Sequence, residues 1–266
     1  MSQLHVSTTQ SQPVVDSRWK DRVRFPALSP TVDQHQEYCE IRLKTGWTRV
    51  GMHDYAQIYS HPGLYEALFY ELLECDSPRR VVGLLDEVRR DTASGCRRIL
   101  DVGAGNGLVG EALRRIGAEA IYAIDILPEA RAAAERDRPG LYHDYLVADL
   151  CNLSSAERER LAAARFDCMT CVAALGFGDI PHQAFISAVN LVADGGLIAF
   201  NIKDAFLDAR YTFGFSALIR TLMDKGIFRQ EASRRYRHRL SSQGVPLYYQ
   251  AIVARKMGSI PADVVD

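Results

Sequence analysis

From Arg97 onward, short apolar runs alternate with segments in which apolar residues recur every three or four positions. The short runs are typical of buried strands, and the longer period is typical of helices packed on one face. We therefore expect strands over residues 99–102, 120–125, 143–150, 166–174 and 197–203. Helices are expected between them, over residues 108–116, 128–138, 154–164 and 181–192. This alternation predicts an α/β fold with a doubly wound, mostly parallel sheet.

The end of the chain follows a different pattern. A helix is predicted over residues 213–225, and two long segments with strand character, 228–240 and 247–256, flank a turn that contains Gly244 and Pro246. This arrangement predicts an antiparallel C-terminal hairpin. With these two strands the sheet would have seven.

About a hundred residues precede the first of these strands, which is more than such a sheet needs. Residues 1–36 are rich in Ser, Thr, Gln and Pro, so we expect a flexible N-terminal arm in which Trp19, Val23 and Phe25 are the candidate anchors. Period-two alternation over residues 38–43 and 47–50 then predicts a β-hairpin.

Two helices are expected next, one from Leu64 and one that has Pro78 in its first turn and a polar cap before it. We interpret residues 37–95 as a β-hairpin plus helical cap. Residues 96–266 would then form the main domain.

Composition narrows the class of protein. The chain has 266 residues, 47% of them hydrophobic, and a net charge of −1, which gives no bulk attraction to nucleic acid or to an anionic membrane. No apolar run approaches the roughly 20 residues of a membrane span, and no signal-peptide core is present at the N-terminus. Cys168-x-x-Cys171 lies in an expected strand without a second close pair, so we expect reduced thiols and no metal site. These features predict a cytoplasmic protein without a membrane partner.

The turn between the first strand and its helix carries the chemistry. Gly105-x-Gly107-x-x-Gly110 satisfies a dinucleotide fingerprint, but the first glycine of that fingerprint should directly follow the strand, and here Gly103 does. Starting at Asp101, the pattern Asp-x-Gly-x-Gly-x-Gly resembles that of the class I S-adenosylmethionine-dependent methyltransferases. A carboxylate at Asp101 also suits a ligand that ends in an ammonium group better than a pyrophosphate.

The resemblance covers about residues 97–256 and implies S-adenosylmethionine as the cofactor. Asp125 ends the second strand, where an acid in a nucleotide site accepts from both ribose hydroxyls. In the resembled family, an acid at Asp149 accepts from the adenine amino group, and Asp101 holds the methionine end. Asp125 and Asp149 each also have a purely local alternative, a cap on the helix that starts at Pro128 for Asp125 and a loop cap onto Asn152 for Asp149. The predicted cofactor-binding residues are Asp101, Gly103, Ala104, Gly105, Gly107, Asp125, Ile126, Asp149, Leu150 and Val172.

The stretch after the fourth strand, residues 173–181, is not the Asn/Asp-Pro-Pro-aromatic motif of the DNA and protein-glutamine N-methyltransferases. It resembles the small-molecule branch of the family, which implies transfer of a methyl group to an O, N or C nucleophile of a small-molecule acceptor. A base is required only for a hydroxyl, a thiol or a protonated amine. The catalytic candidates are His53, Tyr59 and His182, each with an alternative as a turn, core or solvated residue.

The segment 234–239 is the only basic cluster. It could serve an RNA- or protein-modifying methyltransferase, although charges on an outer strand commonly prevent pairing with other chains, and a nucleic-acid partner is disfavoured. Two further alternatives are a non-catalytic adenosyl-binding module and an NAD-dependent oxidoreductase. The sequence leaves a homodimer open.

Overall fold

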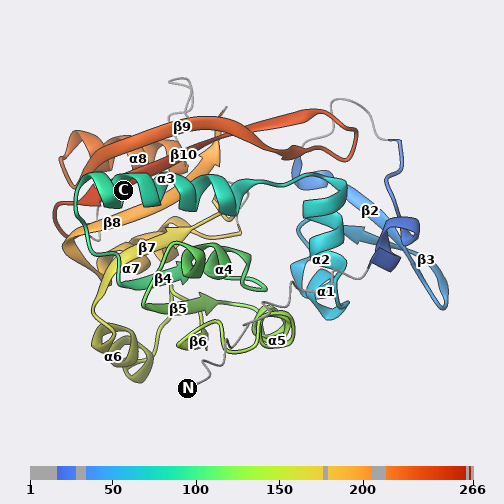
Figure 1. Cartoon of the computed structure of the whole chain (residues 1–266), viewed down its shortest axis with the longest axis horizontal. Helices are drawn as coiled ribbons and strands as arrows, with labels where there is room; N and C mark the ends of the chain where they lie inside the picture. The colour runs from blue at the N-terminus through green and yellow to red at the C-terminus, as the bar shows by residue number, and fades with distance from the viewer. Residues whose placement is uncertain (1–16, 28–33, 176–178, 205–213, 262–263, 265–266) are drawn as a thin grey trace, which may run out of the picture.

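The computed structural model describes residues 17–27, 34–175, 179–204, 214–261 and 264, which form a large sheet flanked by helices and a smaller cap (Figure 1). Seven of the described strands make the large sheet in the order β6-β5-β4-β7-β8-β10-β9. Their bounds are β4 Arg98–Val102, β5 Ala120–Asp125, β6 Asp144–Val147, β7 Phe166–Cys171, β8 Val192–Lys203, β9 Phe228–Leu240 and β10 Pro246–Lys256.

The strands from β4 to β8 pair in parallel, and β10 pairs antiparallel with both β8 and β9. The predicted fold class, a doubly wound and mostly parallel sheet with an antiparallel C-terminal hairpin, is therefore confirmed. Because β10 inserts between its neighbours, β9 is the outer strand of the sheet. The basic segment 234–239 thus lies on a sheet edge.

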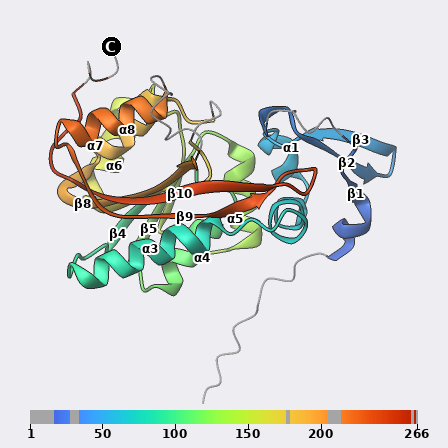
Figure 2. The same cartoon turned by 90° about the horizontal axis from the view of Figure 1, so that it is seen from above.

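Helices cover both faces of the large sheet (Figure 2). Val81 and Leu85 of α3 and Leu113 of α4 pack on one face, and α6, α7 and α8 pack on the other around Phe185 and Phe200. α5 rests beside β5 and β6. The bounds are α3 Ser77–Asp91, α4 Leu108–Arg115, α5 Pro128–Asp137, α6 Ser155–Ala163, α7 His182–Asn190 and α8 Phe215–Asp224.

Several predicted bounds need correction. The fourth strand ends at Cys171 rather than at residue 174, because Ala173 takes a φ of +59° that a strand does not allow. The fifth strand begins early, at Val192, and a Cβ on Gly196 would collide with Val192 and with the backbone of Asp167. The third predicted strand, β6, is shorter than predicted and spans only Asp144–Val147. The last helix, α8, begins at Phe215. Phe213, the predicted start of the last helix, lies outside the described residues.

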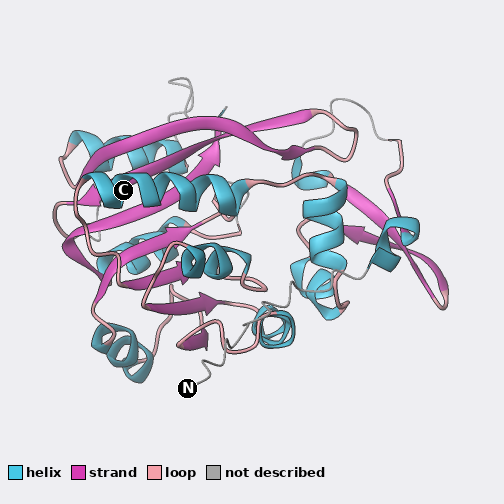
Figure 3. Ribbon diagram, in the orientation of Figure 1, coloured by secondary structure: helices cyan, strands magenta, loops and turns pink. Residues whose placement is uncertain are grey.

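The cap contains its own three-stranded sheet, which stands apart from the large sheet (Figure 3). β2 and β3 form the predicted hairpin, with Ile41 opposite Thr48. The helix predicted from Leu64 is one α-helical turn that continues as a π-helical segment. The bounds are β1 Val23–Arg24, β2 Tyr38–Leu43, β3 Gly46–Gly51, α1 Tyr55–Ser60, α2 Leu64–Glu66 and the π-helical segment Ala67–Leu72.

Part of the predicted N-terminal arm packs on the cap. The short 3₁₀ helix Ser17–Arg22 buries Trp19, whose indole nitrogen donates to the carbonyl of Pro62 at 2.8 Å, and Val23 pairs with Ile41. A second 3₁₀ helix, Gln34–Gln36, leads into β2. The rest of the predicted arm, residues 1–16 and 28–33, lies outside the described residues.

The cap sits beyond the carboxyl ends of the parallel strands and is tied to the main domain at several points (Figure 1). Tyr59 of α1 packs on Ala130 and Ala133 of α5. The buried guanidinium of Arg138 lies 2.7 Å from the Glu66 carboxylate. These contacts fix the cap over the edge of the sheet where ligands of such folds bind.

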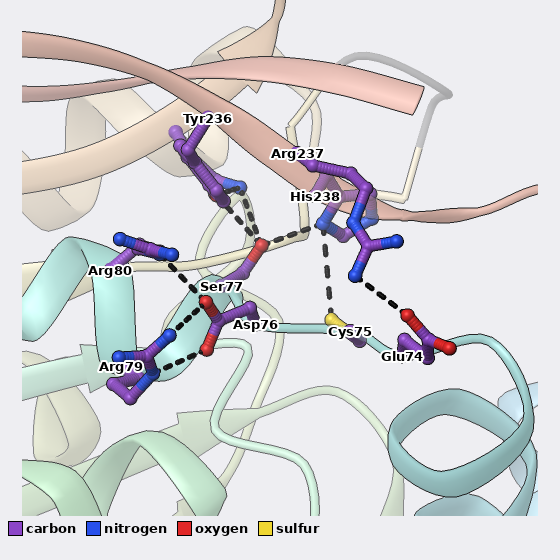
Figure 4. Close-up of polar contacts among 10 residues, drawn as sticks. Glu74, Cys75, Asp76, Ser77, Arg79, Arg80, Tyr236, Arg237 and His238 are labelled. Carbon is purple, nitrogen blue, oxygen red and sulfur yellow. Dashed lines mark hydrogen bonds and ion pairs between the residues drawn. The ribbon is translucent and has the colours of Figure 1, made fainter. Parts of the chain in front are cut away.

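The first turn of α3 lies under β9 (Figure 4). Asp76, at the N-cap position of this helix, makes no capping hydrogen bond with its side chain and instead binds Arg79 and Arg80 at 2.6 Å each. Ser77 is buried, and its hydroxyl lies 2.7 Å from the Tyr236 oxygen and 2.6 Å from His238 Nδ1. The helix α3, which the sequence assigned to the cap, is therefore joined to β9 of the large sheet and packs on that sheet.

Candidate active site

β4 runs into a glycine-rich turn that leads to α4. Gly103, Gly105 and Gly107 have φ values of +66°, +53° and +94°, a region that residues with a side chain rarely adopt. The amides of Gly103 and Ala104 donate to the carbonyl of Ile124 in β5, at 2.9 and 3.3 Å. The turn is therefore held against the end of β5.

A cavity of about 270 Å³ opens at the carboxyl ends of β4, β5, β6 and β7. The strand order changes direction between β4 and β7, and ligands of open α/β sheets bind at such a point. Six predicted cofactor-binding residues line the cavity, namely Gly103, Asp125, Ile126, Asp149, Leu150 and Val172. The cap contributes a second wall, made of His53, Tyr55, Tyr59 and Tyr65.

Asp125, the last residue of β5, holds its carboxylate in a fixed orientation. One oxygen accepts from the Gly105 amide at 2.9 Å, and the other accepts from the Leu127 amide at 3.0 Å. Burial raises the pKa of this carboxyl, and the backbone amides oppose the shift. Each carboxylate oxygen can accept a second hydrogen bond, so the group remains able to bind a pair of ligand hydroxyls.

Asp149 follows β6 and lines the same cavity. Its oxygens accept from the Asn152 side chain at 2.7 Å and from the Cys151 amide at 2.8 Å. The bond from Asn152, followed by that from Cys151, holds the pKa of this carboxyl below its usual value. Asp149 thus both binds Asn152, as in the local alternative, and lines the cavity, as the cofactor prediction requires.

Asp101 lies behind the cavity rather than in its wall. The carboxylate is fully buried and accepts hydrogen bonds of 2.8 Å from the Tyr142 hydroxyl and from Thr170 Oγ1. Burial raises the pKa of Asp101 to about 7, although both hydroxyls oppose the shift. In this conformation Asp101 therefore does not line the cavity, in contrast to the prediction that it holds the ligand. Its buried carboxylate instead has a structural role behind the glycine turn.

Ala104, Gly105 and Gly107 also stand outside the lining of the cavity. Ala104 is buried, and the Gly105 carbonyl accepts from the Tyr145 hydroxyl at 2.8 Å. A Cβ on Gly105 would collide with the hydroxyl of Tyr59. The second glycine of the turn thus permits the close approach of the cap.

Tyr59, one of the three catalytic candidates, covers the turn from the cap. Its ring centroid lies 6.2 Å from that of Tyr55 and 4.9 Å from that of Tyr65. Burial raises the pKa of Tyr59 well above its usual value, so the hydroxyl keeps its proton at neutral pH. Tyr59 can donate a hydrogen bond or present an aromatic face to a cation, but it is not suited to act as a base.

The two histidine candidates occupy different places. His53 lines the cavity, and its Nδ1 lies 3.1 and 3.3 Å from the two carboxylate oxygens of Asp179. His182 does not line the cavity; its ring packs edge-on against Phe215 at 4.4 Å, and burial lowers its pKa. Only His53 is placed to reach a bound ligand. The loop residues 176–178, part of the stretch compared with the family above, lie outside the described residues.

Sequence reasoning missed Tyr65 and Asp179, which also line the cavity. Tyr65 lies in the segment from Leu64 that predicted a helix, and nothing in that pattern distinguishes a residue of the core from one that lines a cavity. Asp179 was visible only as part of an unusual loop. Its proximity to His53, 126 positions earlier, is set by tertiary structure.

Two features bear on other functions. Within the described ranges, no group of three or more His, Cys, Asp and Glu side chains is arranged to hold a metal ion. The helices of that part of the chain are each too short or too polar to span a bilayer.

Residues 100–200 match a sequence family described as a methyltransferase domain. This segment contains the glycine turn, Asp125 and Asp149, the features from which the resemblance was drawn. The chain therefore carries, within residues 100–200, a segment that matches a methyltransferase domain.

Among curated proteins, the chain is similar to a ubiquinone biosynthesis O-methyltransferase of Xanthomonas axonopodis pv. citri, with 30% identity over 139 residues. The counterpart from Xanthomonas campestris pv. campestris is 29% identical over 141 residues. Each alignment covers 50% of this chain and 56% of the relative, so the chain spans little more than half the length of the curated relatives that it matches.

Two solved structures show a similar fold. One is an S-adenosylmethionine-dependent methyltransferase from Clostridium acetobutylicum, with 13% identity, a TM-score of 0.51 and coverage of 73% of this chain and 97% of that one. The other is the N-methyltransferase NodS from Bradyrhizobium japonicum in complex with S-adenosyl-L-homocysteine, with 17% identity, a TM-score of 0.51 and coverage of 76% and 96%. At these identities the likeness concerns the fold.

Proposed function

We propose that this protein is an enzyme that transfers the methyl group of S-adenosylmethionine to a small-molecule acceptor inside the capped cavity. The observation that carries the proposal is the cavity itself, because Asp125 and Asp149, from the ends of two neighbouring strands, line one space together with Gly103 of the glycine turn. A methyltransferase domain with this arrangement has the parts that an adenosyl ligand requires.

The residues present fit that cofactor. Asp125 offers free lone pairs for two ribose hydroxyls, Asp149 offers an acceptor for an exocyclic amine, and Gly103 of the glycine turn lines the same cavity. Ile126 is 61% exposed beside Asp125 and provides an apolar face for a base. When bound, S-adenosylmethionine supplies an electrophilic methyl group on sulfur and leaves as a neutral thioether, so alignment and exclusion of water are the main tasks of the protein.

The cap residues support an enclosed reaction. Tyr55, Tyr59 and Tyr65 form an aromatic wall, which is favourable beside a sulfonium cation. His53, paired with Asp179, is the group that we expect to take a proton from the acceptor where one must be removed, because a carboxylate on one ring nitrogen orients the other. The free state of the six cysteines fits a reducing compartment such as the cytoplasm.

A small-molecule acceptor fits better than RNA. The curated relatives are named as O-methyltransferases of ubiquinone biosynthesis. The basic strand is also engaged within the chain, since Arg234, Arg235 and Arg237 bind carboxylates of Glu87, Asp204 and Glu74 at 2.6 to 2.8 Å. These pairs leave little positive potential for a phosphate backbone.

The proposal is tested in two steps. Calorimetry with S-adenosylhomocysteine and with NADH separates the cofactors, and we expect binding of the first alone. The protein is then incubated with tritium-labelled S-adenosylmethionine and cell extract, and label is counted in the small-molecule, protein and RNA fractions. Label confined to RNA or protein would overturn the small-molecule acceptor, and cofactor binding without label in any fraction would indicate a non-catalytic module.

A further inference from the structure

A second, smaller chamber of about 30 Å³ lies deeper between the cap and the β9–β10 hairpin. It shares part of its wall with the large cavity, and the shared residues are His53, Tyr55, Tyr65, Ala173 and Asp179. These residues therefore mark the junction of the two spaces. With the cofactor in the large cavity, the small chamber is the adjoining space into which part of an acceptor can enter.

The chamber holds an unsatisfied hydrogen-bond acceptor. Gln34 is 7% exposed and lines the chamber, and its side-chain nitrogen donates to the Tyr249 hydroxyl at 3.1 Å. Among the described residues, nothing donates to its buried oxygen, Oε1. An unpartnered buried carbonyl is costly, so this oxygen calls for a donor from a ligand or a water.

The charges around the chamber disfavour an anion. Arg239 lines it, but its guanidinium lies 2.7 Å from the Glu37 carboxylate, and both side chains are only 4% exposed. Burial lowers the pKa of His238 well below its usual value, so this ring is neutral. Asp179 adds a carboxylate at the junction. A carboxylate or phosphate entering the chamber would therefore find no uncompensated positive charge.

We propose that this chamber binds the end of the methyl acceptor that carries an N–H or O–H group, with Gln34 Oε1 accepting its hydrogen bond. Anionic head groups are excluded by the charges described above. The volume admits a head group of a few atoms, so the remainder of the acceptor lies toward the junction, next to His53 and Asp179. This assignment rests on the proposed function, because it takes the large cavity to be the cofactor site.

The test uses three nearly isosteric probes, benzamide, benzoate and acetophenone, of which benzamide alone donates a hydrogen bond. Ligand-observed NMR measures their binding to the full chain saturated with S-adenosylhomocysteine. We expect benzamide to bind at least about tenfold more tightly than the other two, because benzoate and acetophenone lack its N–H donor and would leave Gln34 Oε1 unpaired. Equal binding of benzamide and acetophenone, as expected if the chamber holds only water, or tighter binding of benzoate, would overturn the proposal.

Two variants assign the effect to Gln34. Gln34→Met keeps the length of the side chain and removes the accepting oxygen, and we expect it to abolish the preference for benzamide. Gln36→Met, an exposed change in the same short helix, is the matched control and is expected to retain that preference. Retained preference in Gln34→Met would refute the role of Oε1.

A gain of binding protects the test against a folding defect. Gln34→Glu adds a carboxylate to the chamber that Asp179 also lines, so we expect it to favour the cation benzamidine over benzamide by about tenfold relative to the parent chain. Absence of that reversal would count against the chamber as the binding site. The affinity for S-adenosylhomocysteine, measured separately, shows whether a failure concerns the chamber or the proposed function as a whole.

Discussion

The backbone amide of Gly105 donates a hydrogen bond of 2.9 Å to the carboxylate of Asp125, which ties the glycine turn to the end of the neighbouring strand. The same carboxylate also accepts from the Leu127 amide, so one side chain connects the glycine turn to the segment that follows β5. A ligand bound there would meet a group whose position is already set. Asp125 is therefore the first residue to test.

We expect Asp125→Ala to weaken S-adenosylhomocysteine binding at least about tenfold, because two hydroxyl acceptors and the order of the turn are lost together. Calorimetry measures the change. Asp144→Ala removes a carboxylate at the opposite end of β6, where it pairs with Arg160, and should leave the affinity unchanged. An unaltered dissociation constant in Asp125→Ala would remove this residue from the site.

Asp101 makes stability depend on pH. Its pKa is about 7 in the folded protein against 3.8 as the reference value, because the carboxyl is buried. Between these values the unfolded chain has lost the proton that the folded chain keeps, so the free energy of unfolding falls as pH rises, by about 1.4 kcal/mol per pH unit at the steepest. The contribution is constant below pH 3.8 and levels off above pH 7.

Asp101→Asn removes this titration while keeping the shape of the side chain. We expect the difference in unfolding free energy between the variant and the parent chain to shift in favour of the variant from pH 4 to pH 7. Urea unfolding at several pH values measures it, and Asp144→Asn is the control. A difference independent of pH would show that Asp101 is not protonated in the folded protein.

The fold was largely predictable because its signals are local and repeated. The strand 120–125 and the helix from Pro128 are found where periodicity placed them. The errors occur where a single backbone angle ends an element, as at Ala173, whose positive φ leaves no trace in an apolar run. The N-terminal segment was harder, because composition does not reveal that Trp19 reaches Pro62.

The site was predictable where a residue's role follows from its place at a strand end. Asp125 and Asp149 are such residues, and both line the cavity. The contacts of the cap join residues far apart in the sequence: Gln34 and Tyr249 are 215 positions apart, and Glu37 and Arg239 are 202 apart. No local pattern encodes such pairs, so the second chamber was visible only in three dimensions.

The buried ion pair between Glu37 and Arg239 joins the cap to β9, at a distance of 2.7 Å. We expect Glu37→Gln to lower the free energy of unfolding by about 3–5 kcal/mol, because it leaves the Arg239 charge buried without a counter-charge. The double variant Glu37→Leu/Arg239→Met should recover much of that loss, since neither charge remains. Denaturant unfolding gives both values, and a double variant less stable than Glu37→Gln would contradict this account.

The paired arginines of β9 predict a weak response to RNA. In filter binding with bulk RNA over a salt series, we expect low affinity and a shallow dependence on salt, because the carboxylates of Glu87, Asp204 and Glu74 already neutralise the strand. The variant Glu87→Gln/Glu74→Gln should bind RNA more tightly and steepen the slope. A steep slope in the parent chain would favour the RNA-modifying alternative.

The approach of Tyr59 to Gly105 makes the fit of the cap testable without a ligand. An alanine at position 105 would strain a φ of +53° and place a Cβ against the Tyr59 hydroxyl. Gly140→Ala is the matched control, since φ there is +69° and no atom lies within 4 Å of the added Cβ. Backbone strain alone costs about 1–2 kcal/mol in either variant, and only Gly105→Ala adds the collision with Tyr59, so we expect Gly105→Ala to lose more stability than Gly140→Ala.

Tyr59→Phe in the Gly105→Ala background should restore part of the excess, with a coupling of at least about 0.5 kcal/mol in a double-mutant cycle. Equal losses in the two alanine variants, or zero coupling, would mean that the cap does not press on the turn in solution.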